Sequence, residues 1–83
     1  MNESTEMKLK VLLARVMRVD IATISADAST GTIATWDSLS HMKLVLALEE
    51  EFDVAFDESQ IEHMTSFAKV IELVDQLQTK DFL

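Results

Sequence analysis

The sequence lacks the residues that break helices and those that form cross-links. Its 83 residues include no cysteine, no proline and a single glycine, Gly31. Without cysteine the chain has no disulfides and no thiolate metal sites, which fits a reducing compartment. Without proline, and with many Leu, Ala, Glu, Met and Lys residues, the chain favours helices over strands.

Signals for export and for membrane insertion are missing as well. The N-terminus begins with the acidic and polar residues 1–4, and no basic stretch is followed by an apolar run as in a signal peptide. The purely apolar stretches are a handful of residues long, whereas a spanning helix needs about 20. We therefore expect a cytoplasmic protein that is not inserted into a membrane.

Basic residues are scarce, with 7 Lys and Arg against 15 Asp and Glu and a net charge of −8. Residues 1–48 are balanced, so the whole excess of acids lies in residues 49–83. Nucleic acid is disfavoured as a partner, because phosphate binding needs clustered Lys and Arg. A protein partner with a basic patch is the natural complement, although the acidity alone can also serve to keep a small domain soluble.

The chain has enough apolar residues, 48%, to build a compact core. Its length allows one domain, residues 1–83, with little room for an internal catalytic cavity.

Four stretches show the apolar spacing of helices. They cover residues 5–17, 38–52, 58–63 and 65–78. Asp37 and Asp57 are placed to cap the second and the third, and Gln60 stands in the capping-box position. The sequence therefore predicts an all-α fold, a four-helix bundle with three main helices and a short third helix.

A long loop is predicted over residues 18–36, where Ser, Thr, Asp and Ala dominate. Loops of this length in a compact domain are usually functional or disordered. The spaced residues Ile21, Ile24 and Ile33 indicate that it is pinned onto the core.

The second predicted helix carries two apolar stripes. One stripe consists of Leu44, Val45, Leu48 and Phe52. The other consists of Leu39, Met42 and Leu46, rotated away from the first. Either this helix is surrounded on all sides, or the second stripe is exposed and meets a partner or a ligand chain.

Ser38 opens the second helix, at the positive end of its dipole, where a phosphate ester is tolerated. The plainer interpretation of Asp37 and Ser38 is a capping pair. A hydrolase triad of Ser38, His41 and Asp37 is poorly supported, because G-x-S-x-G is missing and the spacing is unsuitable. No metal site is predicted, since His41 and His63 lack ligand spacing.

The segment Asp37-Ser38-Leu39, followed by Met42 and by Leu44–Phe52, closely resembles the acyl carrier protein family. The pattern Ile61, Thr65-Ser66 and Val70-Ile71 downstream extends this resemblance over nearly the whole chain. It implies a carrier, not an enzyme, with an acyl-carrier-like fold. Ser38, flanked by Asp37 and Leu39, would then bear a covalent 4′-phosphopantetheine taken from coenzyme A.

The resemblance also implies partners. They are a phosphopantetheinyl transferase and the acyl-loading and acyl-transferring enzymes, which dock basic patches on the second helix of a monomeric carrier. The expected docking residues are Met42, Leu46, Glu49 and Glu50.

The sequence departs from the family pattern in two ways. Thr35-Trp36 precedes the D-S-L motif in place of glycine and a small residue, and Ser40 and Lys43 replace common acids. The W-D-S-L motif looks more like stand-alone carriers of specialised lipid, polyketide or polysaccharide pathways than like the carrier of housekeeping fatty acid biosynthesis. A peptidyl or aminoacyl carrier and a helical interaction protein without a prosthetic group are the alternatives.

Overall fold

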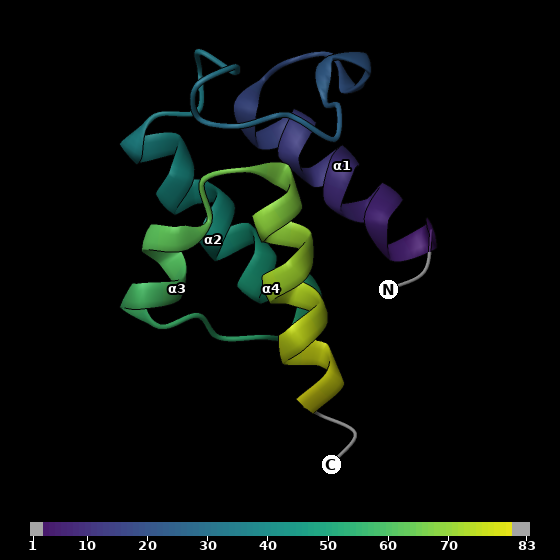
Figure 1. Ribbon diagram of the computed structural model, residues 1–83, viewed down its shortest axis with the longest axis vertical. Coiled ribbons are helices and arrows are strands. Elements are labelled where there is room, and N and C mark those ends of the chain that lie inside the picture. The colour runs from purple at the N-terminus through teal and green to yellow at the C-terminus, as the bar shows by residue number, and fades with distance from the viewer. Residues whose placement is uncertain (1–2, 81–83) are drawn as a thin grey trace.

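The computed structural model describes residues 3–80 and consists almost entirely of helices. In chain order these are α1 (Glu3–Met17), the 3-10 turn η1 (Ile21–Thr23), α2 (Ser38–Phe52), α3 (Glu58–His63) and α4 (Phe67–Lys80). Figure 1 shows α2 and α4 at the centre, α3 beside α2, and α1 with the long connection at the opposite end. The predicted all-α fold with three main helices and a short third one is confirmed.

Local capping explains where the helices begin. Asp37 accepts a hydrogen bond from the N–H of Ser40 at 2.9 Å and starts α2. Asp57 and Gln60 form the reciprocal capping box that starts α3. The hydroxyl of Ser66 accepts from the N–H of Lys69, which explains why α4 begins at Phe67, slightly later than predicted.

Two helices end on residues in the left-handed region. Arg18, directly after α1, has φ of 58°, and Asp53, the C-cap of α2, has φ of 52°. Glycine is the usual residue at such positions because it has no Cβ. Arg18 and Asp53 therefore each hold a side chain in a backbone conformation that favours glycine.

The core lies between α1, α2 and α4, and the connections close it. The inward stripe of α2 is confirmed, since Leu44, Val45 and Leu48 are buried and Phe52 is half-buried. They pack with buried residues of α1, of α4 and of the connections, namely Leu9, Leu12, Leu13, Ala14, Met17, Ile24, Ala28, Ile33, Trp36, Phe56, Met64, Phe67, Val70 and Val74. No helix within the described residues is long and apolar enough to cross a membrane.

The connection from residue 18 to residue 36 is fixed onto this core, as predicted. Ile24 and Ile33 are buried, whereas Ile21 is 38% exposed and does not serve as an anchor. Ser29 forms an antiparallel bridge with Ser66, so the loop is paired with the residues that precede α4. At its end, the hydroxyl of Thr35 donates to the carbonyl of Met17 at 2.6 Å. The loop therefore delivers the chain to the start of α2 in a defined position.

Candidate functional site

The start of α2 presents one free hydroxyl on an ordered base. Ser38 is exposed, and among the described residues its hydroxyl has no hydrogen-bond partner. The residue before it, Asp37, is held by the N–H of Ser40, and its carbonyl accepts from the N–H of His41 at 2.8 Å. The backbone at Ser38 is therefore fixed while its side chain is available for reaction.

The hydrogen bonds that Asp37 accepts as a cap favour the ionised form of its carboxylate. The hydrogen bond from the N–H of Ser40 lowers the pKa of Asp37 below its usual range. The side chain itself is fully exposed, so the cap leaves the surrounding surface open.

The residues present fit a phosphate ester on Ser38. The N–H groups of Ser38 and Leu39 lie in the first turn of α2, where no carbonyl of the helix can accept from them. α2 has 15 residues, so its dipole also favours negative charge at this end. The exposed hydroxyl gives a bulky group room to leave the surface.

A groove adjoins Ser38 and runs from the end of the long loop to α3. Its volume is about 410 Å³, within the range of small-molecule sites. It is lined by Thr30, Trp36, Asp37, Ser38, His41, Ile61, Glu62 and Thr65. We call these residues the Ser38 groove. Trp36 and Ile61 give it apolar walls, and threonines and acids stand among them.

Trp36 and His41 interact in the wall of the Ser38 groove. The indole N–H of Trp36 donates to Nδ1 of His41 at 3.0 Å, and the two rings are stacked with centroids 6.3 Å apart. Nε2 of His41 lies 2.7 Å from the carbonyl oxygen of Ile61 in α3. Nothing in the sequence pointed to these two partners of His41.

These contacts are incompatible with a hydrolase triad. Both ring nitrogens of His41 are occupied, by Trp36 and by Ile61, and the Asp37 carboxylate is bound to the N–H of Ser40. A triad requires the serine hydroxyl to bond to the histidine, and a carboxylate to orient that histidine. Among the described residues, His41 is bonded neither to the hydroxyl of Ser38 nor to a carboxylate.

The second apolar stripe of α2 is exposed. Leu39 is 67% exposed, Met42 46% and Leu46 62%. Of the two arrangements that the sequence left open, the structure therefore has the exposed one. The stripe begins next to Ser38 and follows the outer face of α2.

The charged residues of α2 differ in how accessible they are. Glu50 and Lys43 are exposed. Glu49 is half-buried, and its Oε2 accepts the N–H of Phe56 at 2.9 Å, across the connection to α3. Of the two acids expected at a docking face, only Glu50 is therefore fully available to a partner's cation.

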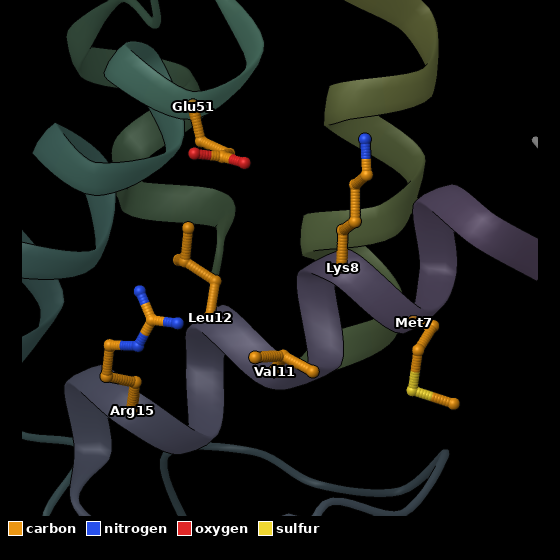
Figure 2. A pocket seen from close by; sticks show the side chains of 6 residues that line it. All are labelled: Met7, Lys8, Val11, Leu12, Arg15 and Glu51. Carbon is orange, nitrogen blue, oxygen red and sulfur yellow. The ribbon is translucent and has the colours of Figure 1, made fainter.

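A smaller hollow of about 190 Å³ lies on α1, away from Ser38. Figure 2 shows Met7, Lys8, Val11, Leu12 and Arg15 along α1, with Glu51 of α2 above them. Its charged groups are of both signs, and no hydroxyl or imidazole lines it. The hollow offers no chemistry comparable to that of the Ser38 groove.

Comparison with known proteins agrees with this geometry. Residues 8–77 match the family model described as "Phosphopantetheine attachment site". The acyl carrier protein of Buchnera aphidicola is 26% identical over 77 residues, which cover 93% of this chain and 98% of that protein. The acyl carrier protein of Akkermansia muciniphila is 29% identical over 77 residues, or 93% of this chain and 96% of that one.

A solved structure is similar too. The solution structure of holo acyl carrier protein from Geobacter metallireducens superposes with a TM-score of 0.82 at 26% identity. The match covers 94% of this chain and 90% of that protein. Similarity in fold and in sequence therefore extends along the same length of chain.

Proposed function

The chain belongs to the acyl carrier protein family, whose cofactor is a covalently attached 4′-phosphopantetheine, and from this premise we propose that Ser38 is the attachment residue. The observation that carries the proposal is the free, exposed hydroxyl of Ser38 at the first turn of α2, beside a groove. Ser40, the nearest other serine, is half-buried, and its N–H is bound to Asp37. Residues 1–83 then form one carrier domain.

Each residue around Ser38 has a defined task in this proposal. The Ser38 oxygen attacks the phosphorus of coenzyme A that bears the pantetheine, the pyrophosphate bond of coenzyme A breaks, and adenosine 3′,5′-bisphosphate leaves. The transferase removes the proton of the Ser38 hydroxyl. Asp37 holds the first turn in place through the N–H of Ser40, and the N–H groups at the helix start face the ester's negative charge. When bound, the cofactor supplies a terminal thiol that carries acyl groups as thioesters.

Acyl carrier proteins act with phosphopantetheinyl transferases and acyl-handling enzymes, and we propose that these dock on the outer face of α2. Leu39, Met42 and Leu46 supply the apolar contact, because they are large, exposed and close to Ser38. Glu50 supplies the acidic contact for a basic patch. Glu49 acts mainly by holding Phe56, and its share in docking stays a prediction.

Lys43 indicates which partners this carrier serves. It is exposed between Leu39 and Leu46, and the residues three and four positions away on α2, Ser40 and Ala47 among them, include no acid. The docking face is thus less negative at its start than in housekeeping fatty acid carriers. We propose a specialised lipid, polyketide or polysaccharide-related pathway, whose enzymes read a mixed apolar and charged face.

Intact mass measurement tests the attachment site. The apo protein is incubated with coenzyme A, magnesium and a broad-specificity phosphopantetheinyl transferase, beside Ser38→Ala and the matched control Ser40→Ala. We expect a gain of one phosphopantetheine in the wild type and in Ser40→Ala, and none in Ser38→Ala. No gain in the folded wild type, with a known carrier modified in parallel, would overturn the proposal in favour of an interaction protein without a prosthetic group.

A further inference from the structure

A chain of two hydrogen bonds connects three segments of the fold at the Ser38 groove. Trp36 closes the long loop, His41 lies in α2, and Ile61 lies in α3. Because Nδ1 of His41 accepts the indole N–H, the ring proton must sit on Nε2, which then donates to the carbonyl of Ile61. The bridge therefore requires a neutral imidazole in one tautomer.

The bridge determines how the groove walls are held. Trp36 is only 3% exposed, so its indole is fixed by the core. Backbone bonds from the N–H of Thr30 to the carbonyl of Thr65 and from the N–H of Phe67 to the carbonyl of Ala28 also secure the loop. Next to Ser38, the contact of His41 with Ile61 is the only side-chain hydrogen bond between α2 and α3 in residues 3–80. Loss of this contact would remove the side-chain hydrogen bond that ties the α3 wall of the groove to α2.

We propose that His41 is a positioning residue for the cofactor: by bridging Trp36 to Ile61 it holds the Ser38 groove in the shape that receives the arm attached to Ser38. The proposal rests on the function proposed above. The amide groups of a pantetheine arm find hydroxyl partners in Thr30 and Thr65, and its methyl groups find Trp36 and Ile61.

The apo protein allows a direct test, because Trp36 is its only tryptophan. Exchange of the indole N–H with solvent is measured by NMR in the wild type and in three variants. His41→Ala removes both bonds, whereas His41→Gln keeps an acceptor and a donor. The matched control is His63→Gln, because His63 is exposed and bonds to the carbonyl of Ser59 in its own helix.

Relative to intrinsic exchange, the indole N–H should exchange about fivefold faster in His41→Ala, the factor that corresponds to one hydrogen bond. The wild type, His63→Gln and His41→Gln should keep the protection that His41→Ala loses. Equal exchange in the wild type and in folded His41→Ala at neutral pH would overturn the bridge.

The role of His41 toward the arm is tested on the loaded protein. After attachment is verified by mass, isotope-filtered NOEs are recorded between the arm and the side chains of Ile61 and Thr65. We expect these NOEs in the wild type and in His41→Gln, and at least a twofold loss in His41→Ala. If His41→Ala does not fold, Trp36→Phe removes the N–H donor while keeping an aromatic ring, and should show the same loss.

Unchanged NOEs in a variant whose bridge is broken would show that His41 is purely structural and would overturn the proposal. Failure to load Ser38 is a different result. Such a failure appears as a missing mass increase and contradicts the proposed function itself. The exchange measurement on the apo protein then still decides whether the bridge exists.

Discussion

Two leucines of α2 should respond very differently to truncation. Leu44 is completely buried in the core, whereas Leu46, two residues on, is mostly exposed on the outer face. Truncating a buried leucine to alanine removes its burial and leaves a cavity, which together cost about 2–5 kcal/mol. Truncating an exposed one away from special features usually changes the free energy of unfolding by about 0.5 kcal/mol or less.

Urea unfolding followed by far-UV circular dichroism measures the difference. For a domain of this size the slope is about 1 kcal/mol per molar urea. Leu44→Ala should therefore lower the midpoint by about 2–5 M, which is a large part of the total stability of a small domain. Leu46→Ala should move it by about 0.5 M or less.

The same pair separates stability from docking. Because Leu46 lies on the face proposed for partners, Leu46→Ala should raise the KM of the phosphopantetheinyl transferase for the carrier without lowering stability. Leu44→Ala, corrected for its folded fraction, should leave that KM unchanged. If both variants lose similar stability, the orientation assigned to α2 is wrong, and an unchanged KM in Leu46→Ala would remove this residue from the docking face.

Three further outcomes are expected. Arg18→Gly and Asp53→Gly should each raise the free energy of unfolding by about 0.5–1 kcal/mol in thermal melts, because glycine adopts their left-handed φ without strain. The control Arg15→Gly, inside α1, should lower the free energy of unfolding by about 1 kcal/mol. A drop in both glycine variants would contradict the strain argument. Asp37→Ala should lower the melting temperature at neutral pH, and the difference from the wild type should shrink in acid. Because the pKa of Asp37 is lowered in the folded state, the ionised cap stabilises the protein above the usual carboxyl pKa, and this stability is lost as pH falls through the pKa of the folded state. A deficit that stays constant down to the most acidic pH at which the fold survives would argue against an ionic cap. Finally, moderate salt or magnesium should raise the melting temperature, because the acids from Glu49 to Glu58 repel one another, and a flat or falling value would speak against such repulsion.

The helices could be predicted because their boundaries are set locally. Asp37 and Asp57 cap through N–H groups three residues further along the chain, so α2 and α3 have the bounds expected from the sequence. Ser66 shows the limit of this reasoning. Its hydroxyl caps α4, so that the helix begins at Phe67, but the pairing of Ser66 with the distant Ser29 could not be predicted from the sequence.

The two apolar stripes of α2 could be predicted from the sequence, but whether the second stripe is exposed could not. Helical periodicity places Leu39, Met42 and Leu46 together on one stripe. Whether a stripe is covered depends on where other helices pack, and that follows from the tertiary arrangement. In the fold, α1 and α4 pack against the opposite stripe and leave this one in solvent.

The contacts of Glu49 and His41 could not be predicted, because their partners lie outside the helical repeat. The sequence suggested Glu49 only as a docking residue, yet it binds the N–H of Phe56 seven residues on. His41 bonds to Trp36 five residues before it and to Ile61 twenty residues after it. The only hint in the sequence is that a tryptophan precedes the helix start and a histidine follows it. This spacing does not determine whether the two side chains bond to each other.

The position of Ser38 would link the proposed attachment to the proposed docking. The three residues before it are each held by a different contact: Thr35 to α1, Trp36 to His41, and Asp37 to Ser40. The exposed stripe begins one residue later, and a rise of 1.5 Å per residue places Leu46 only about 12 Å along the axis from Ser38. An enzyme that covered this stripe would therefore have its reacting groups close to the Ser38 oxygen. If Ser38 is the attachment residue, one helix start would serve many partners, because recognition of the face and access to the serine would come from the same two turns of α2.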